Sequence, residues 1–147
     1  MATYTYTTHV RWMGGHRGHL KCGNGAEMDF SAPPKLYGEE GVLTPEDAFL
    51  AAVNTCYHMM LVWAAERLHL DMVSYECEAE GVARDRLDKT SEFESVVLRP
   101  KVVVRGASYG VVEKALRMAR KYSLIAESIK PEVIIQPDVS IQEPPDT

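Results

Sequence analysis

Cys56 is the side chain in this sequence best suited to covalent chemistry. A cysteine thiolate is a strong nucleophile, and its sulfur can be oxidised and then reduced again. Cys56 lies in the run AFLAAVNTCYHMMLVWAA, where nearly every neighbour is apolar. Burial among such side chains disfavours a thiolate, so a reactive Cys56 needs a cation close by. The alternative interpretation is that Cys56 is a small buried hydrophobic residue.

Arg17 is the candidate for this cation, in the glycine-rich segment GGHRGHL. His58 is a poor choice because two residues of helix turn the side-chain direction by about 200° away from Cys56. Glu46 is a candidate to hold the Arg17 guanidinium in a fixed orientation. Both residues also have simpler explanations, because a loop arginine is usually solvated and a glutamate suits the start of a helix.

The other two cysteines, Cys22 and Cys77, complete an odd number without a CxxC spacing. This pattern argues against a disulfide scaffold and against a structural zinc site, so we expect free thiols in a reducing compartment. The spacing H-x2-H-x2-C of His16, His19 and Cys22 is a weak metal motif, because side chains alternate between the faces of a strand. We therefore expect neither a metal nor a cofactor.

The N-terminal third has the pattern of a β-meander. Thr3 to Met13 reads TYTYTTHVRWM, with the alternation of a half-buried strand. Short runs around residues 19–22 and 26–30, separated by a glycine-rich turn, predict a hairpin that continues the same sheet.

A long helix is predicted from Pro45 to about His69. Thr44 is a suitable cap, proline suits the first helical position, and acidic residues follow it. The middle of this helix is apolar on nearly every face, yet Asn54 and His58 interrupt it and no second apolar stretch exists. We therefore expect a buried core helix and no membrane association. Covering such a helix needs a second subunit, which predicts a homodimer.

The C-terminal half continues with two strand-like runs, residues 73–83 and 93–105, that resemble a long antiparallel hairpin. Ser108 can cap a helix that ends near Tyr122, a short helical segment covers residues 123–129, and EVIIQPDVSI supplies a final strand. The order β-β-β-α-β-β-α-α-β predicts a single α+β domain over residues 1–147 with antiparallel sheets around the long helix.

The charge balance and the N-terminus narrow the classes of function. With 16 basic and 21 acidic residues the net charge is −5, which argues against nucleic-acid binding. No basic segment followed by an apolar run opens the chain, so we expect no signal peptide and a cytoplasmic protein.

Two segments carry a resemblance to a known family. The run TPEDAFLAAVNTCYHMMLVWAAE is similar to the long helix of the OsmC/Ohr (osmotically inducible protein C and organic hydroperoxide resistance) family, and ARKYSLIAESIKPEVIIQPDVSI resembles its second cysteine region and terminal strand. The resemblance implies an intertwined homodimer with two composite sites that reduces organic hydroperoxides in the oxidative stress response. There, a thiolate attacks the peroxide, an arginine paired with a glutamate stabilises the thiolate, and a second cysteine closes a disulfide that a dithiol reopens.

Carried over to this sequence, the resemblance places Cys56 at the position of the reactive cysteine. It places Glu46 at the helix-start carboxylate, Arg17 at the loop arginine, and Ser123 where the second cysteine should be. The serine is a departure from the family pattern, because a hydroxyl cannot form a disulfide with an oxidised cysteine. Ser123 has a structural explanation as the cap of the last short helix.

Three outcomes for the chemistry follow from this departure. In the first, Cys56 works by a one-cysteine cycle and an external thiol or dithiol resets it. In the second, Cys22 or Cys77 resolves the oxidised Cys56, which requires a short distance between their Cα atoms. In the third, peroxide turnover is lost and the protein binds a small hydrophobic ligand or a protein partner. The first is the leading prediction, and the third is its alternative.

Overall fold

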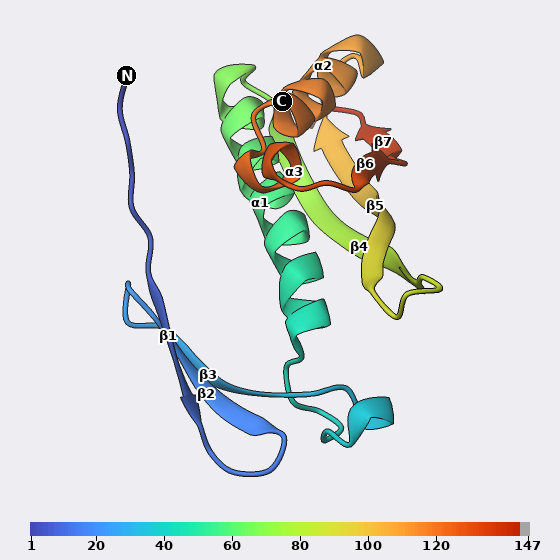
Figure 1. The fold of residues 1–147 in the computed structure, drawn as a ribbon. Coiled ribbons are helices and arrows are strands. Elements are labelled where there is room, and N and C mark those ends of the chain that lie inside the picture. Colours follow the sequence, from blue (N-terminus) through green and yellow to red (C-terminus); the bar gives the residue numbers. More distant parts are fainter. Residues whose placement is uncertain (145–147) are drawn as a thin grey trace. The chain divides into compact units, whose positions relative to one another are not determined.

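Three short strands near the N-terminus form an antiparallel sheet in the order β1-β2-β3 (Figure 1). β1 spans Thr8–Trp12, β2 spans Arg17–Cys22 and β3 spans Glu27–Ser31. The meander is therefore confirmed, but β1 is shorter than the predicted run and is exposed along its whole length instead of being half-buried. Val10 and Trp12 are 57% and 76% exposed, so these apolar side chains of β1 are open to solvent in the described structure.

This structure, a computed structural model, describes residues 1–144. The chain divides into two compact units, the first from Met1 to Phe49 and the second from Leu50 onward. In the first unit no hydrophobic side chain is fully buried, and its buried side chains include Ser31 and Thr44. The single domain predicted over residues 1–147 thus consists of two units, and its last three residues lie outside the described part.

The long helix α1 spans Pro45–Arg67 and begins as its sequence predicts. The Thr44 hydroxyl accepts a hydrogen bond from the Asp47 backbone N–H (3.1 Å) and donates one to the Asp47 carboxylate (2.8 Å), which satisfies the free end of the first turn. At the other end His69 adopts a left-handed conformation with φ of 53°, and the Leu70 N–H returns to the Ala65 carbonyl. This cap ends the helix two residues before the predicted limit.

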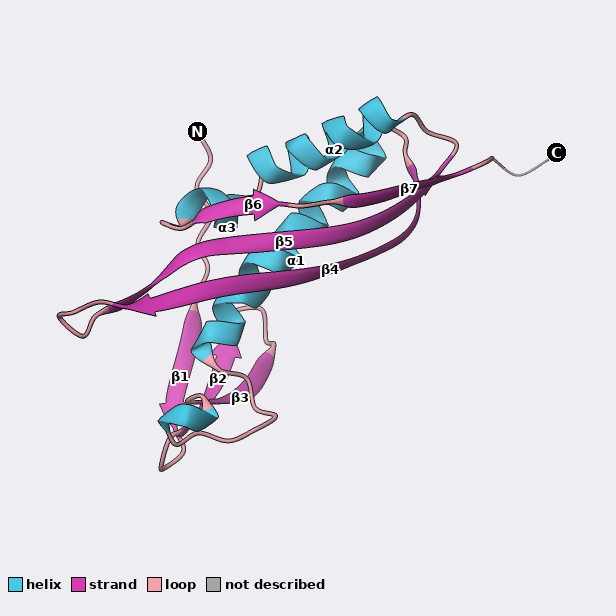
Figure 2. Ribbon diagram, turned by 90° about the vertical axis from the view of Figure 1, so that its right-hand side faces the viewer, coloured by secondary structure: helices cyan, strands magenta, loops and turns pink. Residues whose placement is uncertain are grey.

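In the second unit, β4 (Asp71–Asp85) and β5 (Ser91–Arg105) form the predicted antiparallel hairpin. Figure 2 shows the hairpin running alongside α1. Every second residue of β5 from Val96 to Val104 is buried, as period-two alternation requires. The matching residues of β4 are half-buried, whereas Glu76, Glu78 and Glu80 point to the exposed face. The core of this unit therefore lies on one face of the hairpin.

The C-terminal elements return to the same sheet. α2 spans Tyr109–Lys121 and α3 spans Leu124–Ser128, and the Ser108 hydroxyl caps α2 as predicted by accepting a bond from the Val111 N–H (3.3 Å). The final strand, predicted as one, is two strands: β6 at Glu132–Ile135 and β7 at Asp138–Gln142.

Both of these last strands pair with β5 in the parallel direction. The prediction of antiparallel sheets is thus confirmed for the first sheet and for the hairpin, but it is wrong for the C-terminal strands. The reason is the intervening helices, because a chain that leaves a strand and returns through a helical crossover runs parallel to it. Pro137, which has no N–H to donate, stands where the predicted strand is interrupted.

Within this chain α1 buries one stripe rather than all of its sides. Its buried residues recur at helical spacing on one face: Val53, Tyr57, Leu61, Ala64 and Ala65. By length and composition alone the helix is long and apolar enough to cross a membrane, and 28% of its 18-residue apolar window is buried. Through this stripe α1 contributes to the core of the second unit, as expected for a core helix.

Candidate active site

Cys56 and Ser123 meet in the second unit, although they are 67 positions apart in the sequence. The Ser123 hydroxyl donates a hydrogen bond to the Cys56 sulfur, with 3.3 Å between Oγ and Sγ. Ser123 is fully buried, whereas Cys56 is half-buried and free of any disulfide. A neutral hydroxyl donor therefore stands in contact with the one cysteine sulfur that the sequence singles out for chemistry.

The hydrogen bond from Ser123 to Cys56 shows that the Ser123 side chain does not cap α3, contrary to the prediction from the sequence. Ser123 does stand at the N-cap position of α3, and the Glu127 N–H bonds to its backbone carbonyl (3.0 Å). Its side chain, however, makes no capping hydrogen bond. The hydroxyl points to Cys56 instead. The backbone carbonyl of Ser123 thus bonds within α3, while its side chain contacts the thiol.

Cys77 lies on the other side of α1 from Cys56. The Asn54 side chain donates a hydrogen bond to the Cys77 carbonyl (3.1 Å), so Cys77 of β4 lies on the side of α1 to which Asn54 points. Asn54 and Cys56 are two residues apart, so their side chains point about 200° away from each other. Burial also raises the pKa of the Cys77 thiol, which keeps it protonated. Both observations argue against Cys77 as the residue that resolves an oxidised Cys56.

Arg17 is held by two carboxylates of the first unit. Its Nη2 atom lies 2.7 Å from Asp29 Oδ2 and its Nη1 atom lies 2.5 Å from Glu39 Oε2. These contacts raise the pKa of Arg17, with the Asp29 hydrogen bond as the largest cause. The guanidinium is thus a fixed positive charge on β2, partly open to solvent.

Asp29 also binds His19, so the three side chains form one network. Asp29 Oδ1 lies 2.7 Å from His19 Nδ1, and His19 Nε2 lies 3.1 Å from Glu27 Oε1. Hydrogen bonds from Arg17 and then from His19 lower the pKa of Asp29. Hydrogen bonds to Asp29 and then to Glu27 raise the pKa of His19, because they favour its charged form.

The loop that carries Glu39 is held in place by Ser31 of β3. The buried Ser31 hydroxyl accepts a bond from the Glu39 N–H (2.9 Å) and donates to the Ala32 carbonyl (2.7 Å). Gly38 leaves no space for a side chain, because a Cβ there would lie 1.5 Å from the Ala32 oxygen. Glu39 therefore reaches Arg17 from a backbone position that is tightly specified.

Glu46 stands in the first turn of α1, exposed to solvent. Among the ion pairs of residues 1–144, those of Arg17 involve Asp29 and Glu39 and none involves Glu46. The structure thus brings Ser123 to Cys56 and gives Arg17 two carboxylates that the sequence interpretation missed. Arg17 and Cys56 belong to different units, and their pairing stays a prediction.

A signal for one of the two missed carboxylates was present in the sequence. In the observed pairing of β2 and β3, Asp29 lies opposite His19, and Ser31 lies opposite Arg17. Because Asp29 and Ser31 are two residues apart, Asp29 lies on the same face of the sheet as Arg17 and His19. Glu39 has no such signal, since it lies in a loop whose path depends on Ser31 and Gly38. His16, His19 and Cys22 do not gather: within the described residues, no His, Cys, Asp or Glu cluster is arranged to hold a metal.

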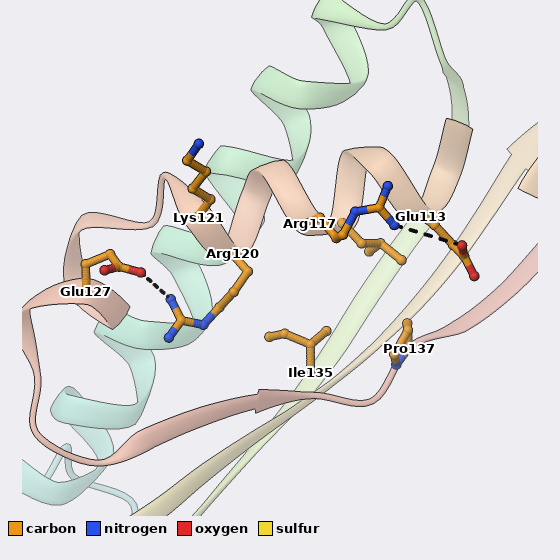
Figure 3. A pocket seen from close by; sticks show the side chains of 8 residues that line it. Glu113, Arg117, Arg120, Lys121, Glu127, Ile135 and Pro137 are labelled. Atoms are coloured by element: carbon orange, nitrogen blue, oxygen red, sulfur yellow. Dashed lines mark hydrogen bonds and ion pairs between the residues drawn. The ribbon is translucent and has the colours of Figure 1, made fainter. Parts of the chain in front are cut away.

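Two clefts lie beside α2. The first, of about 670 Å³, is lined by charged and apolar residues: Glu113, Leu116, Arg117, Arg120, Lys121, Glu127, Ile135 and Pro137. Figure 3 shows Arg120 turned toward Glu127 and Arg117 turned toward Glu113, at 2.9 and 4.0 Å. The second, of about 720 Å³, lies between α1 and α2 and contains no acidic residue.

Comparison with known families gives one match over most of the chain. The model of a family described as OsmC-like protein matches residues 38–138, a range that includes Glu46, Cys56 and Ser123. Arg17 lies outside the matched range. No curated protein matches the sequence.

Solved structures share the fold. An OsmC-like protein of unknown function from Vibrio cholerae superposes with a TM-score of 0.83 at 24% identity, covering 92% of this chain and 99% of that chain. An organic hydroperoxide resistance protein from Elizabethkingia anophelis gives a TM-score of 0.73 at 18% identity, covering 95% and 97%. A third, from Bacillus subtilis, gives 0.65 at 19% identity, covering 95% and 100%. These similarities confirm the α+β fold with its long helix.

The network around Asp29 predicts the titration of His19. Asp29→Asn removes the largest cause of the raised pKa, so we expect the pKa of His19, measured by NMR of its ring, to fall toward the ordinary histidine value. Because the folded-state pKa is raised, charged His19 stabilises the fold below the ordinary pKa, and this contribution disappears as the pH rises through the raised value. Glu40→Gln, an exposed neighbour of Glu39, is the control. Equal His19 titration in Asp29→Asn and wild type would show the network to be wrong.

Proposed function

The chain belongs to the OsmC-like protein family, and we propose that it is a thiol-dependent peroxidase that reduces organic hydroperoxides through Cys56. The observation that carries the proposal is the hydrogen bond from Ser123 to the Cys56 sulfur. A sulfur that is half-buried, free and contacted by a donor has both access to solvent and support for negative charge. The fold shared with organic hydroperoxide resistance proteins supports the same chemistry.

The first step is attack by the Cys56 thiolate on the outer oxygen of the hydroperoxide. A sulfur–oxygen bond forms, the O–O bond breaks, and the alkoxide leaves as an alcohol after taking a proton. Cys56 becomes a sulfenic acid and the peroxide is reduced. We propose Arg17 as the cation that stabilises the thiolate, with Glu46 as the helix-start carboxylate of the same composite site.

The second step uses a thiol from outside the chain. A thiol condenses with the Cys56 sulfenic acid, releases water and forms a mixed disulfide, and a second thiol returns Cys56 to its reduced form. The balance is one hydroperoxide and two thiols converted to one alcohol, one disulfide and water. Ser123 supports this one-cysteine cycle because its hydroxyl contacts the sulfur yet cannot take the place of the incoming thiol. Such a cycle fits a soluble protein of the cytoplasm, where reduced thiols are supplied.

We propose that the working form is a homodimer. The apolar side chains of β1 are exposed, no hydrophobic side chain of the first unit is fully buried, and α1 buries one stripe. A three-stranded sheet without a covered face is marginal in water, so a second copy is the economical source of cover.

Replacement of Cys56 is the direct test of the proposed chemistry. We expect Cys56→Ser to lose thiol-dependent consumption of an organic hydroperoxide down to the rate of buffer, whereas Cys22→Ser keeps the wild-type rate. In wild type, iodoacetamide at pH 7 should label Cys56 well before Cys77, whose half-buried thiol is kept protonated by its raised pKa. Equal peroxide consumption by wild type and Cys56→Ser would end the assignment.

Restoring a second thiol tests the role of Ser123. After peroxide without reductant, wild type should form a dimedone adduct at Cys56, which marks a sulfenic acid. In Ser123→Cys the new thiol stands at the observed contact distance, so we expect a disulfide in place of the adduct and a preference for dithiol reductants.

Two further variants make this test specific. Ser128→Cys places a thiol at the exposed end of α3 and should keep the adduct. Ser123→Ala removes the hydrogen bond, worth about 1 kcal/mol, and should slow alkylation of Cys56 about fivefold at neutral pH. Persistence of the dimedone adduct in Ser123→Cys would refute the proposed contact.

Sedimentation tests the dimer. We expect wild type to sediment as two copies of the 16.4 kDa chain. Trp12→Asp should raise the dissociation constant at least about thirtyfold, as loss of a tryptophan anchor does in other interfaces. Leu87→Asp changes a fully exposed leucine of the β4–β5 turn and should have no effect. A wild-type chain that remains monomeric at micromolar concentration would be evidence against the proposal.

A further inference from the structure

The cleft between α1 and α2 is a groove of about 720 Å³ in the second unit, and its lining comes from two helical stripes. On α1, Met60, Trp63 and Arg67 follow Cys56 at spacings of four, three and four residues, which places all four on one side of the helix. On α2 and its C-terminal end, the stripe is Lys114, Met118 and Tyr122.

The middle of the groove is apolar and aromatic. Met60, Met118 and Trp63 are half-buried, and the rings of Trp63 and Tyr122 meet edge to face with 5.3 Å between their centroids. Thioethers and aromatic edges adapt to apolar bodies of varied shape. Such a lining provides contact area for a hydrocarbon chain or ring.

Two cations stand in this groove without a carboxylate partner. The Arg67 guanidinium lies over the Trp63 ring at 5.4 Å from its centroid, and Lys114 projects from the middle of α2. Among the described residues, neither Arg67 nor Lys114 forms an ion pair. In the neighbouring cleft of Figure 3, by contrast, Arg117 and Arg120 are both paired with glutamates.

The charge pattern indicates which ligand fits. In a chain with a net charge of −5, two unpaired cations in an apolar groove lined by no acidic residue are complementary to an anion with an apolar body. Arg67 in the last turn of α1 also suits the helix dipole, and Lys114 lies mid-helix; both side chains are exposed to solvent at the edge of the groove.

We propose that this groove is a binding site for an anionic amphiphile, with its carboxylate at Arg67 and Lys114 and its apolar body along Met60, Trp63 and Met118. Eleven residues separate Cys56 from Arg67, a rise of about 16 Å along α1. An extended dodecanoate chain has a similar length, so its tail ends near the turn that carries Cys56. The site goes beyond the proposed peroxidase, because this binding requires no peroxide and no thiol.

Dodecanoate below its micelle concentration is the probe, and Trp63 fluorescence is the readout in a Trp12→Phe background. We expect a saturable change with dodecanoate, weaker binding of neutral dodecanol, and a loss of affinity of about tenfold or more in Arg67→Gln and in Lys114→Gln. Arg117→Gln, on the same helix but in the other cleft, is the matched control and should bind as wild type does. Isothermal calorimetry repeats each titration, because Arg67→Gln alters the surroundings of Trp63.

The test is separable from the proposed peroxidase. Dodecanoate should bind Cys56→Ser with the wild-type affinity and should slow the alkylation of Cys56 in wild type. Arg67→Lys, which keeps the charge, should retain most of the affinity, and circular dichroism checks that each variant folds. Equal affinity for dodecanol and dodecanoate, no effect of either glutamine variant, or a groove that is closed by self-association without amphiphile would each overturn the proposal.

Discussion

Helix α1 carries more apolar side chains than the described structure buries, and both the proposed association and the proposed binding start from this constraint. The 23-residue helix gives its stripe from Val53 to Ala65 to the core of the second unit, against the buried face of β5. Its other apolar side chains, such as Met59 at 57% exposure, keep water contact. This exposed apolar surface on a long helix is one of the observations behind the proposed homodimer. The uncovered sides are therefore available for association and for binding, and Cys56 lies at the margin between them and the core.

The position of Cys56 at this margin is what the proposed chemistry depends on. A thiol in the centre of the core would be inert, and one on the open surface would lack support for its charge. Cys56 is half-buried and has a neutral donor, Ser123, from the second unit. The fixed cation that the proposed chemistry needs belongs to the first unit, where Asp29 and Glu39 hold Arg17.

Local signals in the sequence predict most of the fold and less of the site. The Thr44 and Ser108 caps and the alternation along β4 and β5 follow from short-range patterns, and the structure confirms these predictions. The direction of β6 and β7 depends on a crossover rather than on their own residues. The same holds for the site: the local pattern at Ser123 is that of a cap, only the family resemblance placed it where a second cysteine should be, and the 3.3 Å distance to Cys56 shows where its hydroxyl points. Contacts over 67 positions leave no local signal.

A second cysteine at position 123 could both donate a hydrogen bond to Cys56 and form a disulfide with it, whereas a serine can only donate the hydrogen bond. A thiol there would hydrogen-bond to Cys56 before oxidation and consume it afterwards, ending the contact. The hydroxyl makes this contact but cannot form a disulfide, so in the proposed cycle it stays available as a donor to the sulfur or to its bound oxygen. Resolution then depends on what reaches the half-buried sulfur from outside. In the proposed one-cysteine cycle, the choice of reducing thiol therefore rests on the approach to Cys56 and not on a second thiol within the chain.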